Sequence, residues 1–229
     1  MKTTYYLGID QGTTGTTALV FDEDWQVRGK GYAEHTQYYP KPGWVEHDPL
    51  EIWEKVKKSV ASALDEARIK ASDLRATGIA NQGETCMVWE KDTGKPVYPA
   101  IVWQDRRAAA AADKLGAEFG VRADAYFSAL KIQWILDHVQ NGRERAQKGE
   151  LLAGTLDSWL IWNMTGRKVF TTDPSTASRT MLYNLHEKQW DPELFQLTGI
   201  PRTMLPEINA SAGIVGLTSP NAFFEAEIP

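Results

Sequence analysis

The sequence of 229 residues predicts a fold of the α/β class, on three observations. Residues 5–37 contain three apolar segments separated by short turns, which is typical of consecutive antiparallel strands. After residue 48, strand-like runs alternate with segments whose apolar residues recur at helical spacing. No interior stretch has the composition of a flexible linker. Together these observations indicate one domain in which helices cover a sheet.

The strand-like runs are rich in β-branched and aromatic residues and are bounded by turn residues. A Gly/Thr turn follows the first run, and a Lys-Asp-Thr-Gly-Lys turn separates the fifth from the sixth. In chain order the runs are residues 5–10, 16–22, 29–37, 74–80, 85–90, 97–103 and 151–154.

The clearest predicted helix begins after Asp48, which can accept hydrogen bonds from helix amides. Pro49 suits the first helical position, and Glu51 lies three residues after the cap. Ser128 is expected to cap a later helix, and Asp191 with the proline that follows it a short one. The other helical segments are residues 104–119 and 156–164.

Composition excludes several classes of protein. Lys and Arg total 25 against 30 Asp and Glu, a net charge of −5, whereas binding to nucleic acid or to an anionic membrane favours a basic excess. Cys86 is the single cysteine and cannot form an internal disulfide, which fits a reducing compartment. No apolar run approaches the ~20 residues of a membrane span, and the N-terminus lacks the layout of a signal peptide. We therefore expect a cytoplasmic protein.

A Gly/Thr turn ends the first strand-like run, in the sequence Gly8-Ile9-Asp10-Gln11-Gly12-Thr13-Thr14-Gly15. Glycines let a backbone approach a ligand closely, and turn amides and threonine hydroxyls can donate to phosphate oxygens. The Asp10 carboxylate could hold a hydrated Mg²⁺, which binds through one or two carboxylates plus phosphates. The other interpretation is an ordinary hairpin turn with a strand-end aspartate, which turn chemistry alone favours.

Polar residues also follow two later strand-like runs, as Asn81-Gln82-Gly83-Glu84-Thr85 and as Trp103-Gln104-Asp105-Arg106-Arg107. Ligand sites in α/β proteins gather at the carboxyl ends of strands, so these side chains suit a hydroxylated small molecule, with Trp103 as a flat wall for its carbon skeleton. The alternatives are an ordinary polar loop and, since the chain has nine tryptophans, a tryptophan of the core. No pair of histidines has zinc-ligand spacing, and Cys86 has no CxxC partner.

Longer blocks extend these motifs along nearly the whole chain. With the Asp10 turn they resemble the FGGY family of carbohydrate kinases and, within it, the enzymes that act on glycerol. Tyr126, Ser128, Lys131 and Trp134 have the spacing of one family signature. The other blocks are residues 39–49, 88–96, 100–104, 154–160 and 177–182.

The resemblance implies a ribonuclease-H-like domain, as in actin-like and hexokinase-like ATPases, with a mixed five-stranded sheet flanked by helices. It implies transfer of the γ-phosphoryl group of ATP to a hydroxyl of a polyol or sugar, with Mg²⁺ as the metal. Phosphoryl transfer depends mainly on positioning and charge stabilisation.

The resemblance also assigns roles to residues. Glu84 would accept hydrogen bonds from substrate hydroxyls, Trp103 would contact the carbon chain and Tyr126 would bind a further hydroxyl. Asp10 would be the metal ligand. The remaining implied site residues are Gln82 and Gly83 at the substrate and Gln11, Gly12, Thr13 and Thr14 at the phosphates.

Two positions depart from the glycerol-acting enzymes, which have arginines where this chain has Thr17 and Gly83. The segment between Phe119 and Tyr126 is also shorter than in those enzymes. A site built to bond a hydroxyl loses affinity when a partner is missing. A different or larger polyol, or a ketose such as xylulose, is therefore an alternative substrate.

Residues 1–229 are expected to be the N-terminal, substrate-side domain of such a kinase. The general-base aspartate and the nucleotide domain are expected beyond Pro229, so no catalytic residue is predicted within the chain. The implied partners are a small polyol or sugar and the protein's own C-terminal domain, and the full-length protein is expected to be a homo-oligomer. A non-catalytic polyol-binding module is the alternative function. An actin-like or chaperone ATPase shares the Asp10 turn but does not explain Lys131 and Trp134.

Overall fold

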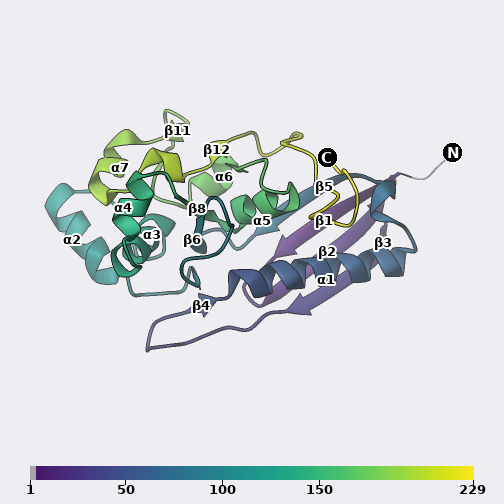
Figure 1. Ribbon diagram of the computed structural model, residues 1–229, viewed down its shortest axis with the longest axis horizontal. Coiled ribbons are helices and arrows are strands. Elements are labelled where there is room, and N and C mark those ends of the chain that lie inside the picture. Colours follow the sequence, from purple (N-terminus) through teal and green to yellow (C-terminus); the bar gives the residue numbers. More distant parts are fainter. Residues whose placement is uncertain (1–3) are drawn as a thin grey trace.

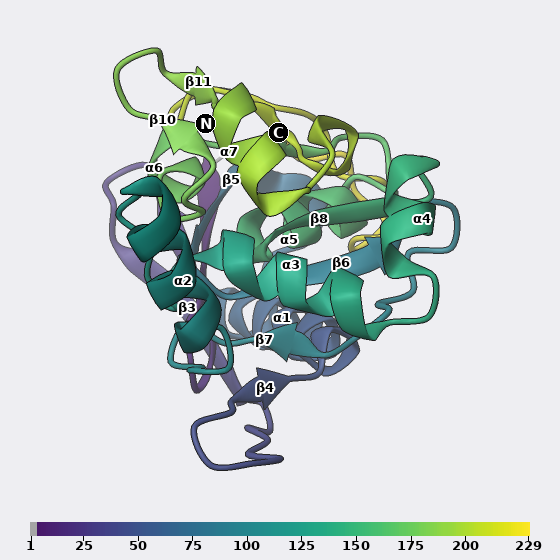
Figure 2. The ribbon, with the colours of Figure 1, turned by 90° about the vertical axis from the view of Figure 1, so that its left-hand side faces the viewer.

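The α/β class is confirmed by a computed structural model that describes residues 4–229, so Met1–Thr3 of the expected domain lie outside it. Two four-stranded sheets lie one after the other along the molecule, with helices packed on both (Figure 1). The first sheet includes the Asp10 turn. The second lies between the first sheet and a group of helices at the other end (Figure 2).

The first sheet has the order β3-β2-β1-β5. The strands β1 (Tyr5–Gln11), β2 (Gly15–Asp22) and β3 (Val27–Glu34) are antiparallel, as predicted, and β5 (Leu74–Asn81) pairs parallel to β1. The sheet is therefore mixed, but it has four strands within the described residues, where the resemblance implied five. At the outer edge of β5 the amide of Thr77 donates to the carbonyl of Pro229, at 2.7 Å, and a single such bond does not make a strand.

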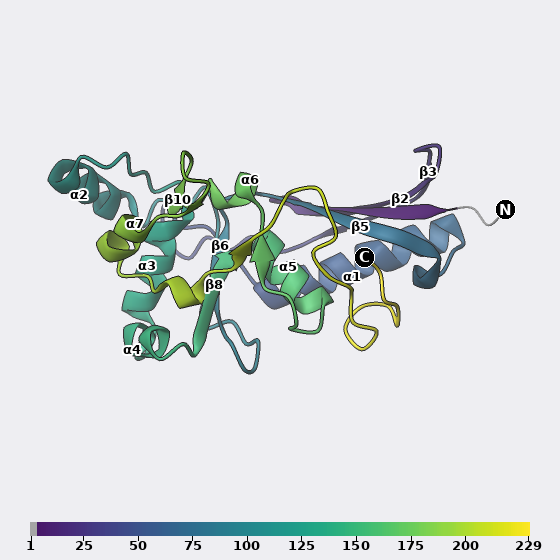
Figure 3. The same ribbon diagram turned by 90° about the horizontal axis from the view of Figure 1, so that it is seen from above.

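Helix α1 (Pro49–Ala67) covers one face of this sheet, which Figure 3 shows from the side. Its predicted start is confirmed, because Asp48 accepts from the amide of Leu50 and a proline opens the helix. A Cβ on Gly31 would lie 1.9 Å from the carbonyl oxygen of Ser59, so the glycine lets α1 lie directly on β3. Glu51, three residues after this cap, accepts hydrogen bonds from the amide and the hydroxyl of Thr36.

The second sheet has the order β4-β7-β6-β8 and only antiparallel pairs. The strands β6 (Cys86–Glu90) and β8 (Leu151–Thr155) agree with the prediction, while β4 (Glu46–His47) was not predicted. The run at residues 97–103 is a strand only at β7 (Ala100–Ile101). Pro99, which has no N–H to donate, ends the pairing on one side.

Alternate residues of β6 face two different cores. Met87 and Trp89 are buried against residues of the first sheet, α1 and α5 (Leu156–Met164). Cys86 and Val88 are buried against the end helices, in particular α3 (Ser128–His138). The second sheet therefore rigidly connects the first sheet to the helical end of the molecule.

Two predicted helix starts are wrong. The segment at residues 104–119 is helical only in α2 (Ala109–Phe119), because the Asp105 carboxylate bonds the amides of Val45 and Arg107 and holds a tight turn. Ser128 does not cap α3: it is the first helical residue, and its hydroxyl donates to the carbonyl of Glu84.

Short elements complete the chain. Helix α7 (Pro192–Thr198) begins at the predicted Asp191 cap. The elements that the sequence did not predict are α4 (Gly142–Gln147), α6 (Pro174–Ala177), β9 (Thr171–Thr172), β10 (Tyr183–Asn184), β11 (Gln189–Trp190), β12 (Glu207–Ile208) and two 3₁₀ turns, Ala71–Asp73 and Arg202–Met204. Within residues 4–229, no helix combines the length and the apolar character needed to cross a bilayer.

Candidate active site

Residues predicted from separate parts of the sequence line one shallow hollow of about 340 Å³. The hollow lies where β1 and β5 end and β6 begins. Six predicted residues line it together with one that was not predicted, Arg179. The predicted ones are Thr13, Gln82, Gly83, Glu84, Trp103 and Tyr126.

Glu84 supplies the carboxylate of the hollow. Its side chain is only 7% exposed, and one of its oxygens accepts from Nε of Arg179. This hydrogen bond raises the pKa of the Arg179 guanidinium above its ordinary value. The pair therefore presents a fixed acceptor next to a fixed donor, which suits the hydroxyls of a polyol or sugar.

Trp103 and Tyr126 form an aromatic corner, with ring centroids 5.7 Å apart and planes at 75°. The indole Nε1 of Trp103 donates to the Thr13 hydroxyl at 3.0 Å, which connects this corner to the Gly/Thr turn. The backbone amide of Trp103 donates to the Thr85 hydroxyl, and that hydroxyl donates to Gln82. The predicted flat wall is thus held from two sides.

The Gly/Thr turn is closed by the amide of Gly12, which donates to the carbonyl of Gly15 at 2.9 Å. The side chain of Gln11 is fully buried and bonds to its neighbours: its Nε2 donates to the carbonyl of Gly12, and its Oε1 accepts from Gln82. Gln11 therefore supports the turn. Thr14, in contrast, is exposed, so its side chain is more accessible to a phosphate than that of Gln11.

Asp10 is exposed at the end of β1 and lies opposite Thr17 in the β1–β2 register. A single exposed carboxylate beside a turn that can bind phosphate fits a hydrated Mg²⁺, which needs only one or two protein oxygens. A metal site made wholly of side chains is not supported, because the part of the chain that the structure describes has no cluster of three His, Cys, Asp or Glu.

Lys131 is a residue whose role the sequence did not indicate, although it belongs to the family signature. It is completely buried, and its Nζ donates to the carbonyls of Tyr126 at 2.7 Å and Glu84 at 3.3 Å. A third, longer contact of 3.5 Å reaches the carbonyl of Val102, next to Trp103. Burial lowers its pKa. One ammonium group therefore holds the three segments that carry the predicted substrate residues.

Arg107 supports the turn that carries Trp103. Its side chain is fully buried between the rings of Trp44 and Trp134, at 3.8 and 4.6 Å, and it forms ion pairs with Glu46 and Asp105. Burial alone would lower the pKa of Arg107, but these two carboxylates raise it overall. Aromatic rings and carboxylates, most of them from distant segments, therefore enclose the guanidinium.

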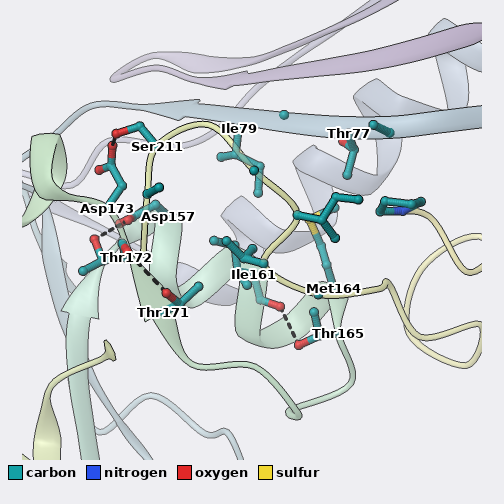
Figure 4. Close-up of a pocket in the computed structure, with 18 of the residues that line it drawn as sticks. Thr77, Ile79, Asp157, Ile161, Met164, Thr165, Thr171, Thr172, Asp173 and Ser211 are labelled. Atoms are coloured by element: carbon teal, nitrogen blue, oxygen red, sulfur yellow. Dashed lines mark hydrogen bonds between the residues drawn. The ribbon is translucent and has the colours of Figure 1, made fainter. Parts of the chain in front are cut away.

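A larger hollow, of about 650 Å³, lies between β5, α5 and residues 210–218 (Figure 4). Asp157 is buried there and accepts from the hydroxyls of Thr155 and Thr172, at 2.5 and 2.6 Å, and burial raises its pKa. Of the residues that the sequence analysis singled out, Asn81 lines this hollow, and its Nδ2 donates to Asp157 at 3.5 Å. The residues that line the candidate active site do not line it, so the two hollows have separate linings.

The mixed sheet, its Gly/Thr turn and the hollow lined by a carboxylate and aromatic rings define a kinase-like domain of the actin and hexokinase class. A sequence profile described as the FGGY family of carbohydrate kinases, N-terminal domain, matches residues 5–229. The chain belongs to the FGGY family of carbohydrate kinases.

Several relatives are glycerol kinases. The chain is 52% identical to glycerol kinase 2 of Thermotoga maritima, over 98% of this chain and 47% of the relative. It is 50% identical to the glycerol kinase of Carboxydothermus hydrogenoformans, over 100% of this chain and 48% of the relative. The chain therefore spans about half the length of the curated relatives it matches.

Solved structures agree on the fold. The glycerol kinase of Plasmodium falciparum, solved with ADP, is 30% identical and has a TM-score of 0.88, over 99% of this chain and 47% of that one. A xylulose kinase from Lactobacillus acidophilus is 20% identical, with a TM-score of 0.79 over 98% of this chain and 47% of that one, which supports the fold alone.

Proposed function

We propose that this chain is the substrate-side domain of an ATP-dependent kinase that phosphorylates a hydroxyl of a small polyol or sugar. The proposal is carried by the meeting of Glu84, Trp103 and Tyr126 in one hollow that also touches Thr13 of the Gly/Thr turn. The glycerol kinase relatives at about 50% identity support an alcohol as the acceptor.

In the proposed mechanism, Glu84 accepts hydrogen bonds from acceptor hydroxyls and Tyr126 binds a further hydroxyl. Trp103 contacts the carbon chain and limits its movement. The Thr13–Trp103 hydrogen bond keeps the acceptor and the phosphate turn at a fixed separation. Such positioning supplies much of the catalysis in phosphoryl transfer.

The phosphate end would be formed by the turn at residues 11–14, with the amides and hydroxyls of Thr13 and Thr14 as donors and Gln11 and Gly12 as its frame. Asp10 would hold Mg²⁺, which when bound offsets the negative charge of the phosphates. Gln82 and Gly83 shape the acceptor side.

Among residues 4–229, the carboxylate of the hollow is Glu84, and Arg179 already occupies it. A general base needs to lie within hydrogen-bond reach of the reacting hydroxyl. We therefore propose that the base, an aspartate, and most of the nucleotide site come from a C-terminal domain. That this protein is cytoplasmic and, at full length, homo-oligomeric are further predictions, checked by cell fractionation and light scattering.

The test is a coupled ADP-release assay on the full-length protein with glycerol, erythritol, xylulose and ribulose. The Glu84→Gln variant should lower kcat/KM by roughly 10²-fold or more, because it replaces a charged acceptor in a largely buried position. Glu187→Gln, at an exposed residue of the β10–β11 turn, is the matched control and should have wild-type kinetics. No ADP release with any polyol or ketose would refute the proposal, and binding without turnover would favour the non-catalytic polyol-binding module.

A further inference from the structure

The hollow of the candidate active site has no side chain on the side formed by Gly83. This glycine has φ +61°. A Cβ built on it would meet Arg179 Cγ at 3.9 Å and, apart from its two neighbours in the chain, no other atom of the described residues within 4 Å. The space beside Gly83 is therefore bounded by Arg179, which lies far from it in the sequence.

Arg179 is held in a defined position. Its Nε donates to Glu84, and its guanidinium lies over the rings of Tyr126 and Phe127, at 5.5 and 5.4 Å from their centroids. The backbone supports it as well, because its amide donates to the carbonyl of Thr176, in α6. A stacked, ion-paired guanidinium loses little further rotational freedom when it binds a ligand.

Arg179 still has donors available to the hollow. Its side chain is 42% exposed and lines the hollow. Its hydrogen bonds to Glu84, through Nε, and to the side chain of Tyr126 leave other N–H donors available. A guanidinium has five N–H donors in a planar fork, which matches adjacent oxygen atoms. The terminal amino groups therefore suit neighbouring hydroxyls of an extended acceptor.

We propose that Arg179 is a substrate-binding, specificity-determining residue and that, with Gly83, it selects polyols or ketoses with four or more carbons over glycerol. This rests on the proposed kinase function. The empty space at Gly83 accommodates the additional carbon, and the terminal amino groups of Arg179 donate to the additional hydroxyls. Glu84 accepts from the hydroxyls on the other side.

The experiment measures kcat, KM and the direct binding of glycerol, erythritol and xylulose to the full-length protein, in wild type and in Arg179→Met and Arg179→Lys. Arg179→Met should raise KM and Kd for the longer acceptors by roughly 10- to 100-fold. It should raise those for glycerol by clearly less, although Glu84 loses its partner whichever acceptor binds. Arg179→Lys should recover only part of the affinity for the longer acceptors, because lysine lacks the planar fork of N–H donors. Arg167→Met is the matched control: Arg167 also lies over a ring, that of Trp162 at 5.2 Å, but does not line the hollow.

A second variant tests the space itself. Gly83→Asn keeps a residue type that tolerates positive φ and fills the space, so it should lower kcat/KM for the longer acceptors more than for glycerol. The inference is overturned if the wild-type protein prefers glycerol or if Arg179→Met changes KM for all acceptors alike. It is also overturned if the Arg179→Met variant binds the longer acceptors with wild-type affinity. Binding that depends on Arg179 without ADP release would refute the kinase proposal while supporting this inference. Absence of polyol binding by wild type would refute both.

Discussion

Lys131→Met is the substitution for which the structure predicts the most informative loss of stability and of acceptor binding. Methionine has a similar length and no charge, so the variant removes the ammonium group while keeping the buried side chain. The carbonyl of Glu84 would still accept from the Ser128 hydroxyl at 3.0 Å, and that of Val102 from the amide of Asp105 at 3.0 Å. The main loss therefore falls on the 2.7 Å bond to the carbonyl of Tyr126.

A hydrogen bond from a charged donor contributes about 1.5–3 kcal/mol to stability. Removal of the buried ammonium also removes its desolvation cost, which offsets part of the loss. We therefore expect the free energy of unfolding to fall by about 2 kcal/mol, and the Tm by roughly 4–8 °C for a chain of this size. Because Tyr126 loses its anchor, acceptor affinity should fall by more than the change in stability would cause.

The assay is guanidinium denaturation followed by tryptophan fluorescence, together with polyol binding at a temperature where both proteins are folded. Lys148→Met, at an exposed lysine that pairs with Glu144 on α4, is the control and should change stability by less than about 0.5 kcal/mol. An unchanged midpoint and slope for Lys131→Met, with normal polyol binding, would contradict the role of Lys131 as the common anchor.

Three other substitutions test other parts of the fold. Arg107→Met should lower the free energy of unfolding by about 3–5 kcal/mol, because Glu46 and Asp105 stay buried without a cation. The neighbouring Arg106→Met is the control. A loss below about 1 kcal/mol for Arg107→Met in chemical denaturation would contradict the argument. Gly31→Val should prevent α1 from packing on β3, since a Cβ there lies 1.9 Å from a backbone oxygen. Circular dichroism should then show a largely unfolded chain. Gly78→Val, at a glycine with open space around its Cβ position, is the control and should fold. Burial lowers the pKa of His47 to about 3, whereas in the unfolded state the pKa is ~6.5, so the folded state binds fewer protons. The contribution of His47 to stability is therefore complete above pH ~6.5 and falls as the pH decreases toward 3, by about 2 kcal/mol between pH 7 and pH 5. His47→Asn should remove much of that slope in denaturation curves, and a slope that stays unchanged would refute the assignment. Its ring neighbour His35, whose pKa burial also lowers, contributes to the slope that remains.

The elements predicted correctly are those whose signals are local. The start of α1 depends on Asp48 and the proline after it, and the strands β1, β2, β5 and β6 depend on short apolar runs between turn residues. The failed start at residue 104 depends instead on Asp105, whose partners lie near residue 45. Such long-range contacts leave no periodic pattern in the sequence.

The candidate site divides in the same way. Glu84, Trp103 and Tyr126 were predicted because family motifs contain them, and the structure brings them to one hollow. The roles of Lys131 and Arg179 depend largely on contacts with residues far from them in the sequence, such as that of each with Glu84. A buried lysine and a half-exposed arginine have ordinary sequence neighbours, so only the fold reveals what they bind.

The order in which the hollow can form during folding follows from its make-up. Its lining extends from Thr13 to Arg179, so segments that lie far apart in the sequence must meet before the hollow exists. Closing loops of this length costs chain entropy that only contacts made afterwards repay, which slows the folding of such topologies. Ligand binding at this hollow therefore reports that the segments from Thr13 to Arg179 have come together, because a chain in which one of them is still unfolded lacks a wall of the hollow.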